Sequence, residues 1–163
     1  MKVEDIMTRE VVTVAEKDTL QEVSKVFFER SISGAPVLDS TGEVVGMVSE
    51  SDIVKSVKPY EERLKMIYPS LSFMSVTFEK NTEEKAIDDV VREVQHKTVR
   101  EIMSRQVHTL SPDDPISKAV TMINEENVNR LPVIIEGKLV GIVTRADILR
   151  CLALIDLGFL EGA

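Results

Sequence analysis

The sequence has a single cysteine, Cys151, and only two histidines, His96 and His108. One cysteine cannot form an intramolecular disulfide or a cysteine cluster for zinc or iron–sulfur, and the two histidines lie far apart without metal-ligand spacing. Cys151 lies in an apolar stretch with helical spacing, which favours a core thiol. The sequence therefore predicts no metal site and no cysteine chemistry.

Aromatic residues are also scarce: they make up 4% of the chain, and there is no tryptophan. The 43% of hydrophobic residues must therefore build an aliphatic core, and 163 residues suffice for one substantial core or two small ones. No run approaches the roughly 18 apolar residues of a membrane span. The N-terminal stretch "MKVEDIM" carries charges where a signal peptide would be apolar. These absences favour a cytoplasmic protein without a membrane anchor.

Basic charge is in deficit, with 20 Lys and Arg against 28 Asp and Glu and a formal net charge of −8. This balance argues against the broad basic surface that nonspecific nucleic-acid binding needs. The sequence also lacks a Ser/His/Asp or Cys/His constellation and a glycine-rich phosphate loop. Asp52 and Asp147 could mimic a carboxylate dyad, but they begin separate predicted helices. We therefore expect no enzymatic activity.

The chain contains an internal repeat. Residues 3–54 and 99–149 align with one gap beside Thr41, and 16 of the 51 aligned pairs are identical. A repeat of about 50 residues that occurs only twice is not a solenoid array. It indicates two similar modules that share an interface.

Each repeat has the pattern of a β-α-β-β-α module. A short strand leads to a helix that Asp18, or Asp114 with Pro115, is expected to start. Two strands joined by a glycine turn follow, and a second helix comes after Ser49 or Thr144. The pattern predicts an α/β (α+β) fold in which two modules related by pseudo-twofold symmetry pack two small sheets back to back. The expected strands are residues 11–14, 35–38 and 43–49 in the first repeat and 107–110, 131–135 and 138–144 in the second.

About 40 residues separate the repeats, and part of this insert is expected to be helical. The stretch "NTEEKAIDDVVREVQHK" predicts an amphipathic helix with an apolar stripe formed by Ile87, Val90, Val91 and Val94. The insert is either an elaborated linker that packs on the repeats or a surface for dimerisation or for a partner.

A Ser/Thr-x-x-Asp motif stands at the last strand-to-helix junction of each repeat. Such a motif can be a helix cap, in which the hydroxyl and the carboxylate bond to each other's backbone N–H groups. It can also belong to a ligand site, because a helix N-terminus presents unpaired N–H groups and positive dipole. Either copy alone favours the cap, whereas the repetition of the whole motif favours a cap that also binds a ligand.

Three motifs, each present twice and in the same order, resemble the CBS domain, named after cystathionine β-synthase. They are "DIMTREVVTV" and "EIMSRQVHTL", then "GAPVLD" and "NRLPVI", then "GMVSESDI" and "GIVTRADI". Two tandem copies form a Bateman module. The resemblance divides the chain into a first CBS domain at residues 1–57, an insert at 58–97, a second CBS domain at 98–157 and a tail at 158–163.

The resemblance implies a noncatalytic regulatory or sensory unit that signals to a partner protein by conformational change, commonly as a homodimer. The ligand would contain adenosine (AMP, ADP, ATP, S-adenosylmethionine or methylthioadenosine) and would bind in clefts between the two domains. Asp52 and Asp147 would accept hydrogen bonds from the ribose diol, with Ser49 and Thr144 beside them. The resemblance adds a second wall to the Asp147 site from Thr13, Val14, Ile32, Ser33 and Gly34, and to the Asp52 site from Thr109, Leu110, Val128, Asn129 and Arg130.

Charge distinguishes the two implied sites. Arg130 has Gly34 as its counterpart in the first repeat, and Arg145 has Glu50. One hypothesis is that one or both arginines hold a phosphate, so that the ligand is a nucleotide. The alternative is that they form surface ion pairs.

A second functional hypothesis is a scaffold without a ligand, in which the paired modules and the insert serve only dimerisation and assembly. The intact Ser/Thr-x-x-Asp motif in both repeats counts against it, because a scaffold needs the two carboxylates only as caps.

Overall fold

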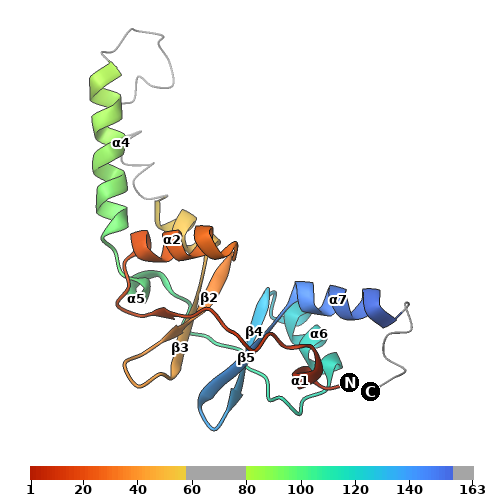
Figure 1. Ribbon diagram of the computed structural model, residues 1–163. Helices are drawn as coiled ribbons and strands as arrows, with labels where there is room; N and C mark the ends of the chain where they lie inside the picture. The colour runs from red at the N-terminus through yellow and green to blue at the C-terminus, as the bar shows by residue number, and fades with distance from the viewer. Residues whose placement is uncertain (58–79, 156–163) are drawn as a thin grey trace. The chain divides into compact units, whose positions relative to one another are not determined.

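The first repeat forms a three-stranded sheet with helices between and after its strands (Figure 1). The computed structural model describes residues 1–57 and 80–155. The sheet order is β1-β2-β3. The elements are β1 (Val14–Ala15), α2 (Leu20–Arg30), β2 (Gly34–Leu38), β3 (Val44–Ser49) and a helix over residues 50–57.

The second repeat forms an antiparallel hairpin that α6 and α7 contact (Figure 1). Short helices open both repeats, and a longer helix from the insert precedes the second. The elements are α1 (Val3–Ile6) at the start of the chain, α4 (Lys80–Gln95), α5 (Val99–Ile102), α6 (Ile116–Glu125), β4 (Arg130–Ile135), β5 (Lys138–Thr144) and α7 (Arg145–Ile155).

The first strand expected in each repeat is shorter than predicted. In the second repeat it is a single parallel bridge, in which Leu110 pairs with Val133. The bridge consists of the Leu110 N–H donating to the Pro132 carbonyl and the Ile134 N–H donating to the Leu110 carbonyl, both at 2.9 Å. The ladder does not continue past it because the next N–H in the ladder would be that of residue 112, which is a proline and has none. In the first repeat the strand is only β1.

The helix starts lie one residue later than predicted. Thr19 is the N-cap of α2, and Pro115 is the N-cap of α6. The carboxylates of Asp18 and Asp114 instead accept N–H groups three residues upstream and so close the preceding turn. Thr19 forms a capping box with Glu22, and the pKa of Glu22 lies below its ordinary value because the backbone N–H and hydroxyl of Thr19 donate to it.

The two hairpins differ by the one residue that interrupts the repeat alignment. In β4–β5, Glu136 and Gly137 have φ values of 49° and 80°, which suits a two-residue turn with two left-handed positions. In the β2–β3 turn the extra Thr41 donates from its backbone and its hydroxyl to the Asp39 carboxylate at 2.8 and 2.7 Å. These bonds lower the pKa of Asp39, with the hydroxyl as the largest cause.

The compact units of the structure do not coincide with the two repeats. Among the described residues, unit 1 comprises residues 1–13, 38–46 and 105–155, and unit 2 comprises residues 14–37, 47–57 and 80–104. The opening segment of each repeat therefore folds with the body of the other. The predicted domains follow the repeats of the sequence. The two compact units differ from them because the opening segments are exchanged.

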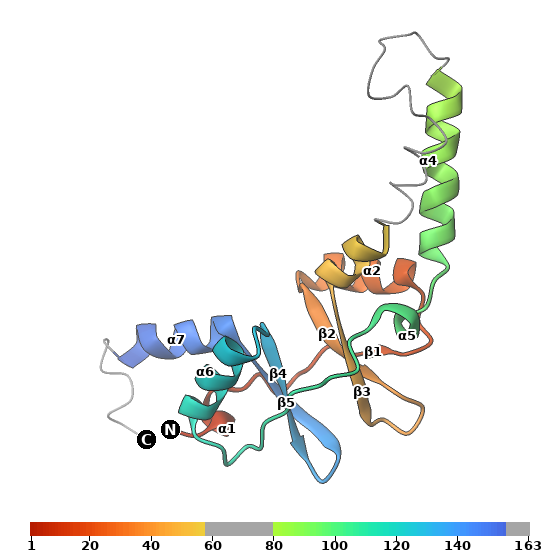
Figure 2. The same cartoon turned by 180° about the vertical axis from the view of Figure 1, so that it is seen from behind.

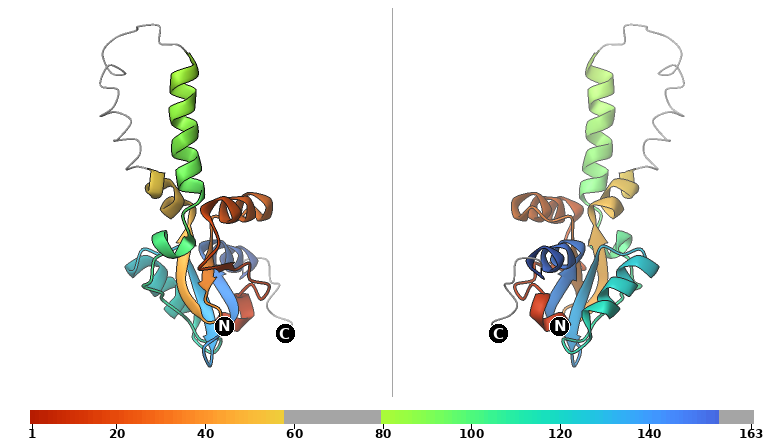
Figure 3. Two further views of the ribbon diagram at one scale, coloured as in Figure 1. Left: turned by 90° about the vertical axis from the view of Figure 1, so that its left-hand side faces the viewer. Right: turned by 90° about the vertical axis from the view of Figure 1, so that its right-hand side faces the viewer.

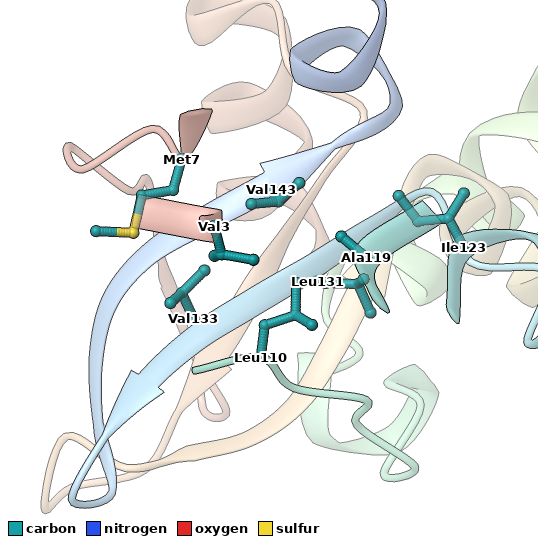
Figure 4. Close-up of a cluster of buried hydrophobic side chains, with 8 residues drawn as sticks. All are labelled: Val3, Met7, Leu110, Ala119, Ile123, Leu131, Val133 and Val143. Atoms are coloured by element: carbon teal, nitrogen blue, oxygen red, sulfur yellow. The ribbon is translucent and has the colours of Figure 1, made fainter. Parts of the chain in front are cut away.

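In unit 1 the exchanged segment is α1 with the residues that follow it. The N–H of Val3 donates to the Asp114 carbonyl at 2.9 Å, and Thr8 exchanges two backbone hydrogen bonds with Ile142 in β5. Met7 lies against Gly141 so closely that a Cβ at this glycine would be 2.5 Å from the Met7 sulfur. The core around them consists of buried aliphatic side chains (Figure 4): Val3, Met7, Leu110, Ala119, Ile123, Leu131, Val133 and Val143.

In unit 2 the second repeat's opening segment makes equivalent bonds. The N–H of Val99 donates to the Asp18 carbonyl at 2.9 Å, and Ser104 exchanges two backbone hydrogen bonds with Met47 in β3. Figure 2 shows α5 beside β1 and the start of α2. The pairing is the same in both units because Thr8 aligns with Ser104 in the repeat, and Ile142 aligns with Met47.

The helix predicted in the insert is α4, and its C-terminal end lies beside α2 (Figure 3). Val94 is buried against Leu20, Val90 packs on this pair, and Val91 is 45% exposed. Three of the four stripe residues can be placed, and only two of them are covered. The rest of the insert, residues 58–79, and the tail at 158–163 lie outside the described residues.

The exchange predicts that Val3 and Val99, both fully buried, hold their segments in place. We expect Val3→Ala and Val99→Ala each to lower the free energy of unfolding by about 2 kcal/mol, since each removes two methyl groups from a packed core. Urea unfolding followed by circular dichroism measures the change. The control is Val54→Ala at a side chain 70% exposed, with an expected change below about 0.5 kcal/mol. Equal effects at all three positions would contradict the exchange.

Candidate functional site

Each Ser/Thr-x-x-Asp motif lies where the last strand of its repeat passes into a helix. Ser49 ends β3 and the helix over residues 50–57 follows, while Thr144 ends β5 and α7 follows. Both aspartates therefore lie in the first turn of a helix, where a carboxylate is favoured by the helix dipole.

The Asp147 carboxylate uses one oxygen to hold the start of α7. Its Oδ2 accepts the backbone N–H of Thr144 at 2.8 Å and the Thr144 hydroxyl at 2.6 Å. The Asp147 N–H lies 3.3 Å from that hydroxyl. Among the residues whose burial is described, Asp147 is the only buried charged residue, at 4% exposure. The sequence prediction of a cap is correct for this motif.

The Asp52 carboxylate is arranged in the same way in unit 2. Its Oδ2 accepts the backbone N–H of Ser49 at 2.9 Å and the Ser49 hydroxyl at 2.6 Å. Asp52 is half-buried. No side chain within the described residues donates to its other oxygen, Oδ1, which keeps its capacity to accept hydrogen bonds.

The Oδ1 oxygen of Asp147 has two neighbours that the sequence did not point to. Arg150 donates to it from Nη2, and the hydroxyl of Thr8 lies 3.5 Å away, at the long limit of a hydrogen bond. Thr8 belongs to the first repeat and reaches this site because the opening segments are exchanged. Arg150 could have been found from its position three residues after Asp147 on a helix. Thr8 could not, since no local pattern links it to Asp147.

The two arginines singled out in the sequence differ in their surroundings. Arg130 opens β4 and stands opposite Thr144 in the sheet register, and the Nη1 atom of its guanidinium is buried. Arg145 is exposed, and its backbone N–H donates to the Asn129 carbonyl at 3.2 Å. The equivalent bond in the first repeat runs from the Glu50 N–H to the Ser33 carbonyl at 3.0 Å. A phosphate-binding role for either arginine stays a prediction.

The fifteen predicted ligand residues are divided between the two units. Unit 2 contains Val14, Ile32, Ser33, Gly34, Ser49 and Asp52. Unit 1 contains Thr13, Thr109, Leu110, Val128, Asn129, Arg130, Thr144, Arg145 and Asp147. Within each unit the structure brings the aspartate together with its own hydroxyl partner. The walls that each site would receive from the other repeat stay a prediction.

The described residues were searched for a metal site and for a membrane-spanning helix. No group of three or more His, Cys, Asp or Glu side chains among them could hold a metal ion. No helix in the same ranges has the length and apolar character of a membrane span.

Comparison with known proteins identifies a family, a relative of similar length and several longer relatives. The CBS-domain family model matches residues 3–59 and 99–154. An uncharacterised protein of Methanocaldococcus jannaschii, MJ1426, is 37% identical over 155 residues, which are 93% of this chain and 91% of that protein. Three other relatives are longer, and this chain spans 14–40% of their lengths.

Solved structures of CBS-domain proteins have the same fold. The CBS-domain pair of protein MJ0100, in complex with 5′-methylthioadenosine and S-adenosylmethionine, is 25% identical, with a TM-score of 0.65 over 93% of this chain and 99% of that one. The protein CBSX2 in complex with AMP is 21% identical, with a TM-score of 0.68 over 95% of this chain and 98% of that one. The second likeness shows the fold alone.

The cap geometry predicts the effect of removing one hydroxyl. We expect Thr144→Val to lower the free energy of unfolding by about 1–2 kcal/mol, because the buried Asp147 carboxylate loses a donor and the helix loses its N-cap. Thr144→Ser keeps the hydroxyl and serves as the control in chemical denaturation. A valine variant as stable as the serine variant would contradict the role given to this hydroxyl.

Proposed function

The chain belongs to the CBS-domain family as a tandem pair, and we propose that it is a noncatalytic regulatory module that binds an adenosine-containing ligand. Asp52 and Asp147 would accept the hydroxyl groups of the ribose. The proposal rests mainly on one observation, that each carboxylate holds its helix through Oδ2 alone.

The chemistry of the carboxylates suits a ribose. An ionised aspartate only accepts hydrogen bonds, and a vicinal diol offers two donors. Oδ1 of Asp52 has no donor among the described residues, and Oδ1 of Asp147 has donors that a ligand could displace. A capping carboxylate therefore has acceptor capacity left for a ligand.

The ligand class follows from the relatives. Protein MJ0100 is described with 5′-methylthioadenosine and S-adenosylmethionine, and CBSX2 with AMP. These molecules share adenosine and differ in what is attached to its 5′ carbon. We therefore assign adenosine as the part of the ligand that the site recognises. Experiment must decide the 5′ substituent, and ADP and ATP are further candidates. One or both of Arg130 and Arg145 would hold a phosphate if one is present.

The proposed mechanism is a shift between conformations. A ligand favours one arrangement of the two domains only as far as it binds that arrangement more tightly. A partner protein that recognises this arrangement would then respond to the ligand. The cytoplasmic location, the homodimer and the partner itself stay predictions from the family resemblance.

A scaffold without a ligand is the competing function, and the capping geometry is the observation that favours it. In a scaffold the carboxylates would serve only as caps through Oδ2, and Oδ1 would bind no ligand.

A thermal-shift panel separates the two functions. With methylthioadenosine, S-adenosylmethionine, AMP, ADP and ATP as probes, a ligand at about 100 times its dissociation constant should add about 2.7 kcal/mol of stability. We expect at least one probe to raise the melting temperature, and the rise to disappear in the double variant Asp52→Ala/Asp147→Ala.

The control for this panel is Asp114→Ala. It also removes a carboxylate that orders a turn before a helix, but outside either motif. Its ligand-induced shift should equal that of the wild type, with each protein compared with its own melting temperature without ligand. No shift with any probe would support the scaffold and contradict the proposed function.

A further inference from the structure

Arg150 lies one turn along α7 from Asp147, with its guanidinium on the Asp147 carboxylate. Residues three apart on a helix are neighbours on its surface, so this contact is local to α7. The Arg150 side chain is 60% exposed, whereas the Asp147 side chain is 5% exposed. A solvent-exposed cation therefore occupies one oxygen of a buried carboxylate.

That oxygen is the one a ligand would need. Oδ2 of Asp147 already accepts two donors from Thr144, which uses both of its lone pairs. Oδ1 also has two lone pairs, and Arg150 takes one of them. The Thr8 hydroxyl at 3.5 Å is a weak competitor for the other. With Arg150 in place, Oδ1 can accept one ribose hydroxyl, and with Arg150 displaced it can accept two.

The first repeat has a different residue at the equivalent position. Lys55 follows Asp52 by three residues, as Arg150 follows Asp147, and no ion pair joins Lys55 to Asp52 among the described residues. Lysine is a compact, strongly hydrated charge, whereas arginine presents a planar fork that matches a carboxylate. The two sites are therefore alike in their caps and different in the group that competes for Oδ1.

We propose that Arg150 is a positioning residue that sets the ligand preference of the Asp147 site. It competes with the ribose diol for Oδ1, so the Asp147 site binds adenosine more weakly than the Asp52 site and discriminates less between ribose and 2′-deoxyribose. This inference rests on the proposed function, because it concerns how the same carboxylates accept the same ligand.

Calorimetric titration of the full chain tests this inference. Asp52→Ala isolates the Asp147 site, and the probes are adenosine and 2′-deoxyadenosine. Adding Arg150→Ala should tighten adenosine binding by about fivefold to tenfold, the effect of roughly one further hydrogen bond. Binding of 2′-deoxyadenosine should change by less than about twofold, since its sugar needs only one acceptor in either case. A structural effect of the substitution would move both ligands together and leave their ratio unchanged.

The converse substitution places an arginine at the equivalent position of the first repeat. In an Asp147→Ala background, Lys55→Arg should weaken adenosine binding at Asp52 and reduce its preference for ribose over 2′-deoxyribose. Lys55→Ala in the Asp52→Ala background is the matched control, and it should leave the Asp147 site unchanged.

The outcomes separate this inference from the function on which it rests. Failure of the wild-type protein to bind any of the adenosine-containing probes would overturn the proposed function, and the inference with it. Binding by the wild type, together with an unchanged ratio of the two ligands after Arg150→Ala, would overturn the role of Arg150 alone.

Discussion

The hydrogen bonds between a carboxylate and the hydroxyl three residues before it fix both the start of a helix and the position of a potential ligand acceptor. In both repeats the last strand ends at this hydroxyl and the helix begins beside it. Because Oδ2 is engaged, the side chain cannot rotate freely, and Oδ1 is held in one place. A cap of this kind preorganises an acceptor at no additional conformational cost to the ligand complex.

The exchange of opening segments brings residues of both repeats together in each unit. Thr8 comes to Asp147 on the segment that pairs with β5, and Ser104 pairs with β3 in the same manner. Neither repeat could complete its own unit alone, because Val3 and Val99 are fully buried in the unit of the other repeat. Each repeat therefore contributes to the folding of both units.

Much of the architecture could be predicted from local pattern. The run at residues 138–144 is the observed β5, and the amphipathic stretch in the insert is helical as α4. The sequence predicts the caps of α2 and α6 one residue too early, because an aspartate before a threonine or a proline serves equally well as a turn residue. The strand predicted at residues 107–110 reduces to one bridge at its last residue, and Pro112, which has no N–H, cannot extend the ladder.

Other features depend on which core a segment joins, and hydrophobic pattern does not contain that information. Nothing in the stretch "VEDIM" shows that Val3 packs with the second repeat. For the same reason Thr8 could not be connected with Asp147. The cap itself was predictable, since its residues lie within four positions of one another.

The division of labour between the two carboxylate oxygens is tested most directly by a crystal structure of the protein with adenosine bound. We expect ribose hydroxyls at hydrogen-bonding distance, about 2.5–3.0 Å, from Oδ1 of Asp52, Asp147 or both, with Oδ2 still bonded to Ser49 and Thr144. Adenosine bound away from both aspartates, or a carboxylate that leaves its capping hydroxyl to reach the ribose, would contradict the account.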